Sequence, residues 1–139
     1  MNDEYYMNIA IKEAKKAFKT GNVPIGAVIV KYNKIIAQAH NKKNSKHNAI
    51  MHAEIIAISK ACKKLKTWYL DDCTIYITME PCMMCAGAIK ESRIKKVIFD
   101  SKNSKTGSSH LLKNIKIQEL NQKSESLKLL KMFFRNKRN

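Results

Sequence analysis

The sequence predicts a single α/β domain built on a mixed β-sheet and spanning residues 1–139. The length of 139 residues suits one domain. Near the start, two apolar runs rich in β-branched residues surround a short polar turn, a pattern typical of a β-hairpin. Further along, strand and helix patterns alternate twice, which indicates a parallel portion of sheet joined to that hairpin.

Each element follows from its local pattern. A helix is expected over residues 3–19, because apolar side chains recur there every three to four positions. Asn2 or Asp3 can cap its start and Gly21 can end it. The other expected elements are strands over 23–30 and 35–40, a loop over 41–48, a helix over 52–64, a strand over 72–78, a helix over 82–92, a strand over 96–99, a loop over 100–109, a short edge strand over 115–117 and a final helix over 124–138.

Composition limits the class of protein. The chain is 45% hydrophobic, which is too apolar for a disordered protein. No apolar run approaches the roughly 18 residues that span a bilayer, so no membrane segment is expected. The acidic start Met1-Asn2-Asp3-Glu4 lacks the pattern of a secretory signal. We therefore expect a cytoplasmic protein.

The charge is strongly positive. Lys and Arg number 27 against 11 Asp and Glu, giving a formal net charge of +16. Such an excess fits a polyanionic partner such as nucleic acid or a membrane surface. It also fits the lysine-rich coding of an AT-rich genome, so charge alone leaves both interpretations open.

Four cysteines divide into two pairs. Cys82 and Cys85 form a Cys-x-x-Cys motif, which in a reducing compartment favours metal or redox chemistry over a disulfide. Cys62 and Cys73 lack that spacing and are expected in the core. A four-cysteine structural zinc site is the alternative, and it would leave His52 without a role.

One histidine and the Cys-x-x-Cys motif predict a zinc site. On a helix, Cys82 and Cys85 would face the same way, in a first turn that favours thiolates, with Pro81 at the first helical position. His52 begins the preceding helix. Three protein ligands with an open fourth position are typical of catalytic zinc, which activates a water molecule. Glu54 is not expected as a ligand; the role open to it is proton transfer. The pattern matches the signature of zinc-dependent nucleobase deaminases.

At this point the sequence resembles the bacterial tRNA-specific adenosine deaminases, from about Tyr6 to Arg138. The metal motif itself is shared by many deaminases of bases and nucleotides, whereas the Lys-Thr-Gly loop and the basic ending point to the tRNA branch. The segments that carry the resemblance are 23–28, Asn41, 52–55, 78–89, 92–94, Lys105-Thr106-Gly107 and the ending Phe133-Phe134-Arg135 with Lys137-Arg138.

The resemblance implies a three-layer α/β/α cytidine deaminase-like fold with a central five-stranded mixed sheet. It implies a homodimer with one Zn²⁺ per subunit, and an anticodon stem-loop held across both subunits. The reaction would convert wobble adenosine to inosine in an arginine tRNA. Carried over by position, the residues expected to bind the substrate are Asn41, Val23, Ile25, Met79, Asn103, Phe134, Arg135 and Lys137 or Arg138, with Glu80 in the same motif as Met79.

Three positions depart from the family pattern. Asn103 stands where relatives commonly have Asp, which can contact a ribose hydroxyl, so we hypothesise a weaker preference for RNA over DNA. Met51 immediately precedes the histidine, where relatives have Ala, and can narrow the pocket or face the core. His110 stands where small residues are frequent.

Some alternatives stay open. The final helix, with Leu127, Leu130 and Phe134 on one stripe, can pack on the sheet, bind RNA or lie on a membrane. The same zinc chemistry would serve a free nucleobase or nucleotide deaminase acting on guanine, cytosine or dCMP. A non-catalytic, zinc-stabilised RNA-binding module is the alternative from another class.

Overall fold

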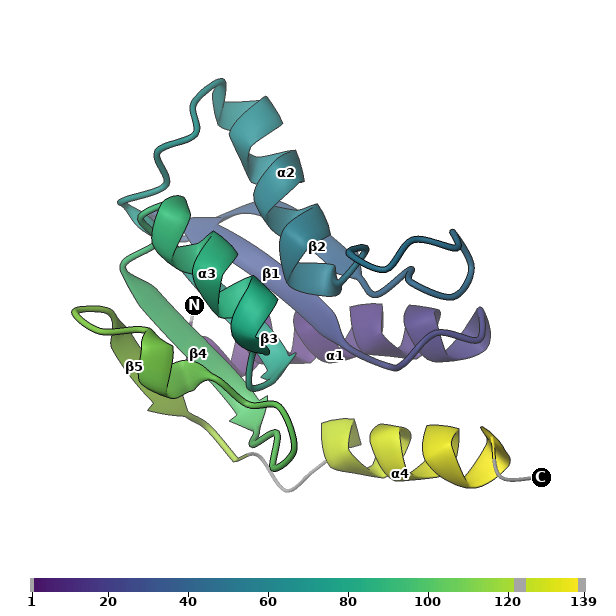
Figure 1. The fold of residues 1–139 in the computed structure, drawn as a ribbon. Helices are drawn as coiled ribbons and strands as arrows, with labels where there is room; N and C mark the ends of the chain where they lie inside the picture. The colour runs from purple at the N-terminus through teal and green to yellow at the C-terminus, as the bar shows by residue number, and fades with distance from the viewer. Residues whose placement is uncertain (1, 122–124, 138–139) are drawn as a thin grey trace.

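The computed structural model describes residues 2–121 and 125–137, which form three layers around a β-sheet (Figure 1). Helices α1 (Asp3–Lys19) and α4 (Glu125–Lys137) cover one face of the sheet. Helices α2 (Ala53–Leu65) and α3 (Met83–Glu91) cover the other. The expected three-layer α/β/α fold is therefore confirmed.

The sheet is mixed and has five strands in the order β2-β1-β3-β4-β5. Strand β1 runs antiparallel to β2 and β3, whereas β3, β4 and β5 are mutually parallel. The carboxyl ends of β2 and β3 therefore lie at one edge, from which the chain continues towards α2 and α3. The strands are β1 (Gly26–Lys31), β2 (Lys34–His40), β3 (Cys73–Met79), β4 (Lys96–Ser101) and β5 (Lys116–Glu119), and a 3₁₀ turn covers Ser109–Leu111.

Strand β1 shows why the sequences of the central strands are continuous apolar runs. Ala27 and Ile29 pack in the core under α2 and α3, while Val28 and Val30 pack in the core under α1. Successive side chains point to opposite faces, and helices cover both faces, so every position must be apolar.

The predicted turn chemistry is confirmed. The side-chain oxygen of Asn2 accepts a hydrogen bond from the Tyr5 amide at 2.9 Å and caps α1. Gly21 follows the end of that helix with φ of 78°. Tyr32 and Asn33 have φ of 49° and 63°, which makes the two-residue turn that joins β1 to β2.

Two predictions about where elements begin were wrong. Strand β1 begins at Gly26 and not at residue 23, because the amide of Ile25 bonds back to the carbonyl of Val23 in a tight turn. Pro81 is not in the first helical position: it precedes Cys82, which is the N-cap of α3.

The stripe predicted on the final helix was also wrong. Leu130 and Phe133 are the buried apolar residues of α4, whereas Leu127 and Phe134 are 37% and 51% exposed. The predicted start of this helix at Ser124 lies outside the described residues, as does Arg138. None of the described helices is long and apolar enough to cross a membrane.

Candidate active site

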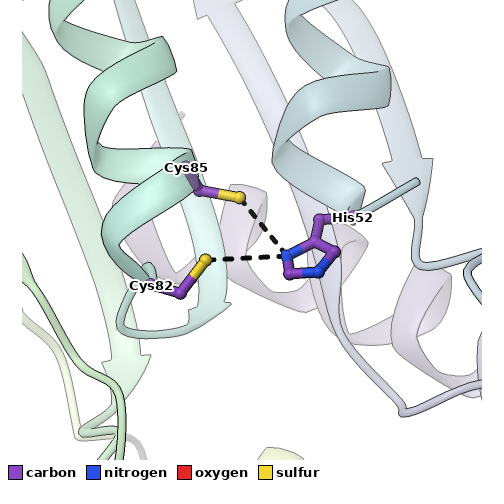
Figure 2. A group of neighbouring side chains, drawn as sticks. All are labelled: His52, Cys82 and Cys85. Atoms are coloured by element: carbon purple, nitrogen blue, oxygen red, sulfur yellow. Dashed lines mark hydrogen bonds between the residues drawn. The ribbon is translucent and has the colours of Figure 1, made fainter. Parts of the chain in front are cut away.

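The starts of α2 and α3 converge and bring together the three side chains predicted to bind metal (Figure 2). His52 is the N-cap of α2 and Cys82 is the N-cap of α3, both with extended backbone, and Cys85 is the third residue of α3. Because an N-cap residue lies half outside its helix, its side chain can project past the helix end. Both positive helix ends therefore point at the same small volume.

The spacing of the three ligand atoms fits a tetrahedral metal. His52 Nδ1 lies 3.7 Å from Cys82 Sγ and 3.5 Å from Cys85 Sγ. A tetrahedral zinc with Zn–N of about 2.0–2.1 Å and Zn–S of about 2.3 Å separates its nitrogen and sulfur ligands by roughly 3.6 Å. With all three ligand atoms within 4.8 Å of one another, the group can hold a metal ion, with Nδ1 as the histidine donor.

The pKa values of the two thiols are shifted in opposite directions. The pKa of Cys82 is lowered to about 3, because Cys85 and His52 hydrogen-bond to its sulfur. The pKa of Cys85 is raised, because its S–H serves as that donor and its sulfur is buried. A cation between the two sulfurs would take the place of this proton, and such displacement is how thiolate sites bind metal.

Glu54 is buried beside the cluster, in the first turn of α2, and is only 4% exposed. Burial raises the pKa of this carboxyl to about 7, and the neighbouring Cys85 and His52 lie close enough to act on it. The angular separation expected between His52 and Glu54 along a regular helix does not apply, because His52 has a non-helical backbone. The carboxyl can therefore exchange protons next to the metal group.

Cys62 and Cys73 stay outside this group. Among the described residues, only His52, Cys82 and Cys85 gather as a potential metal site. Cys73 is buried at the start of β3, and Cys62 packs against the same core from α2. Burial raises the pKa of both thiols, as expected of core cysteines. A four-cysteine site is thereby contradicted.

The residues predicted to line the base pocket lie at the edge of the sheet from which α2 and α3 start. Asn41 is buried; its side-chain amide donates to the carbonyl of Val23 at 3.2 Å, and its backbone amide donates to the carbonyl of Ile25 at 3.0 Å. Met79 ends β3 and is half-buried. The β1–β3 register, which pairs Ala27 with Ile77, runs on towards Ile25 and Met79.

The side chain of Asn103 is engaged within its own loop. Its oxygen accepts hydrogen bonds from the amides of Lys105 and Thr106 at 3.2 and 3.0 Å, and its nitrogen donates to the Thr106 hydroxyl at 2.7 Å. The side-chain oxygen therefore has no lone pair left over for a ribose hydroxyl in this arrangement.

The basic ending is only partly described. Phe134 and Arg135 are exposed on α4, with the Phe134 ring 5.4 Å from that of Phe133 in an edge-to-face contact. Lys137 lies at the end of the α4 backbone, and its side chain, like the whole of Arg138, lies outside the described residues. Met51 is half-buried and His110 is exposed.

Two structural residues near the site were missed. Asn22 is fully buried, and its side-chain oxygen accepts the amides of Asn44 and Ser45 at 2.9 and 3.0 Å, which holds the loop before α2. Glu80 holds the loop that contains Asn103. No local pattern in the sequence marks Asn22 or Glu80 for these roles.

Comparisons with known proteins agree with this geometry. The family model for MafB19-like deaminases matches residues 1–138. A tRNA-specific adenosine deaminase of Bacillus subtilis (strain 168) is 51% identical over 117 residues, covering 84% of this chain and 73% of that protein. These matches show that the chain is related to deaminases over most of its length.

Solved structures of two kinds of deaminase are also similar to this chain. One comes from biochemical and structural studies of A-to-I editing by tRNA:A34 deaminases at the wobble position of transfer RNA. It is 30% identical with a TM-score of 0.84, covering 91% of this chain and 99% of that one. A guanine deaminase from Bacillus subtilis is 32% identical with a TM-score of 0.72, covering 98% and 95%. This chain belongs to the family of the tRNA-specific adenosine deaminases.

Proposed function

We propose that this protein deaminates the wobble adenosine in a tRNA anticodon loop to inosine, with Zn²⁺ held by His52, Cys82 and Cys85. The observation that carries the proposal is the close grouping of these three ligand atoms beside the buried Glu54, in a chain 51% identical to a tRNA-specific adenosine deaminase. The family places the reaction among hydrolytic deaminations.

The chain's own residues supply binding and proton transfer. Bound zinc would supply a water molecule activated for attack on the ring carbon that bears the amino group. Glu54 would carry protons: its carboxylate would accept one, deliver it to the adjacent ring nitrogen and later protonate the leaving ammonia. Its burial excludes bulk water from these transfers. The base is held by Asn41, Val23, Ile25 and Met79.

The RNA is held by the loop that contains Asn103 and by Phe134, Arg135, Lys137 and Arg138 of the basic ending. We propose a cytoplasmic homodimer in which each anticodon loop contacts both subunits, with an arginine tRNA as substrate. Large apolar side chains exposed beside the metal group support a covering partner: Met83, next to Cys82, is 70% exposed, and Ile50 is 53% exposed.

A free-base deaminase is the second candidate, because a guanine deaminase is 32% identical over almost the whole chain. The experiment that decides is incubation of the zinc-loaded protein with an anticodon stem-loop carrying a wobble adenosine, and separately with guanine. We expect inosine in the RNA and no ammonia from guanine. Ammonia from guanine without inosine in the RNA would refute the proposal.

A further inference from the structure

Both ends of the loop over residues 103–109 are fastened to the carboxylate of Glu80. One carboxylate oxygen, Oε1, accepts the amide of Asn103 at 3.2 Å. The other, Oε2, accepts the amide and the hydroxyl of Ser109 at 3.2 and 2.6 Å. Three donors thus converge on two oxygens, and a carboxylate, which only accepts, is the side chain suited to receive them.

Gly107 packs directly against this carboxylate. The backbone of the loop passes so close that a Cβ at position 107 would lie 2.5 Å from Glu80 Oε1 and would also overlap the carbonyl oxygen of Asn103. The φ of Gly107 is not in the left-handed region. The glycine is therefore required by the lack of space beside the Asn103 carbonyl and the Glu80 carboxylate, and not by a special backbone conformation.

The same segment is joined to the metal motif by backbone hydrogen bonds. The amide of Ser108 donates to the carbonyl of Pro81 at 2.8 Å, and the amide of Glu80 donates to the carbonyl of Ser101 at 2.8 Å. Pro81 immediately precedes Cys82. The position of the loop is thus fixed relative to the metal-binding sulfurs by two successive residues, Pro81 through its carbonyl and Glu80 through its side chain.

We propose that Glu80 is a positioning residue: it holds residues 103–109 against the metal motif, so that the loop is preformed for the RNA on either side of the target base. This inference rests on the proposed function and deepens it. Glu80 takes no part in proton transfer, because its carboxylate is already occupied by three loop donors. It sets how tightly the RNA is bound, since a loosened loop must be ordered again during binding.

The test is Glu80→Gln, which keeps the size of the side chain but turns one acceptor into an N–H donor. Whichever way the amide is rotated, one of the two loop ends loses its partner. We expect KM for the anticodon stem-loop to rise about 10- to 100-fold while kcat changes less than about threefold. Glu119→Gln, the same change at an exposed carboxylate on β5, should leave both constants unchanged.

Hydrogen exchange gives a readout that does not depend on activity. Amides of residues 103–109 should exchange faster in Glu80→Gln, with exchange in β3 and α3 and the zinc content both unchanged. Gly107→Ala should loosen the same loop, because its methyl group would overlap both the Glu80 carboxylate and the Asn103 carbonyl oxygen. A merely structural role predicts instead a lower melting temperature with KM unchanged.

Three results would overturn the inference: a fall in kcat at constant KM, which would place Glu80 in the chemistry, a lower melting temperature with KM unchanged, or unchanged exchange over 103–109. Absence of inosine with the unmodified protein would instead contradict the proposed function. The hydrogen-exchange result would still decide whether Glu80 holds the loop.

Discussion

Single side chains at helix starts carry the proposed chemistry. His52 and Cys82 are N-caps, and Cys85 and Glu54 lie in the first turns that follow. At these positions the unpaired amides and the helix dipole stabilise negative charge. The local backbone therefore favours thiolates where a cation is to be bound.

Replacing Cys82 by Ser should remove the metal. A hydroxyl is a far poorer zinc ligand than a thiolate, and two ligands remain, so we expect zinc affinity to fall by more than about 100-fold. Zinc content measured by atomic emission after dialysis checks this. Cys62→Ser is the matched control, because Cys62 lies outside the group, and it should keep its zinc. Full zinc occupancy in Cys82→Ser would refute the ligand assignment.

The metal group was predictable from sequence because its residue types and spacings are local features. Glu80 and Asn22 were not predicted to hold loops, because the hydrogen bonds by which they hold those loops join residues at least 22 positions apart and leave no periodic trace. The position of Asn103 in its loop was predicted, but the engagement of its side chain in that loop was not.

At the scale of elements, α1 lies directly on β1. A Cβ at Gly26 would overlap the carbonyl oxygen of Ala10 in α1. Gly26→Ala must push the helix off the sheet, so we expect a loss of about 3 kcal/mol or more in the free energy of unfolding. Gly87→Ala in α3 is the control, because nothing lies within 4 Å of its added methyl group. There we expect a gain of up to about 1 kcal/mol. Urea denaturation measures both, and equal effects would contradict the packing described.

A buried carboxylate also joins α1 to β2. Glu13 is 4% exposed, with His40 Nδ1 2.8 Å from Oε1 and Lys16 Nζ 2.8 Å from Oε2. Burial alone would raise the pKa of Glu13, but the bonds to Lys16 and His40 outweigh it and hold the pKa below the usual 4.5. Its stabilisation is therefore present above about pH 4.5 and is lost as the pH falls through the lower folded-state value.

Glu13→Gln tests this pair. At pH 7 we expect the variant to be less stable by about 1–3 kcal/mol. The difference from the unmodified protein should shrink as the pH falls below about 4.5, because the carboxylate is then protonated. Denaturation at pH 7 and at steps down to pH 3 measures it. A difference that stays constant across these steps would show that Glu13 does not contribute through its charge.

The positions of helices and strands were predicted better than which side of each helix is buried. Each strand and α-helix gave a local periodicity, and the described strands and α-helices fall where predicted to within about three residues, whereas the 3₁₀ turn over Ser109–Leu111 was not predicted. The face of α4 was misjudged because Leu127, Leu130, Phe133 and Phe134 allow two overlapping stripes. The contact between the rings of Phe133 and Phe18 of α1, with centroids 6.5 Å apart, accompanies burial of the stripe that contains Phe133.

For the whole molecule, the net charge of +16 predicts that binding of an RNA substrate depends on salt. A polyanionic stem-loop releases bound counterions when lysines and arginines contact its phosphates. We expect Kd for the stem-loop to rise about tenfold or more between 50 and 200 mM salt, whereas a neutral base would bind almost independently of salt. Fluorescence anisotropy measures the dependence. A flat salt response would favour the free-base alternative.

The central claim is that this chain is an enzyme in which Glu54 moves protons beside a zinc ion held by His52, Cys82 and Cys85. The most direct measurement compares the unmodified protein with Glu54→Ala on a wobble-adenosine stem-loop, with inosine detected by mass spectrometry and zinc measured in both. We predict zinc retained in both proteins and inosine formation reduced by at least about 100-fold in the variant. Equal inosine formation by the two proteins, or none by either as expected of a zinc-stabilised binding module, would contradict the account.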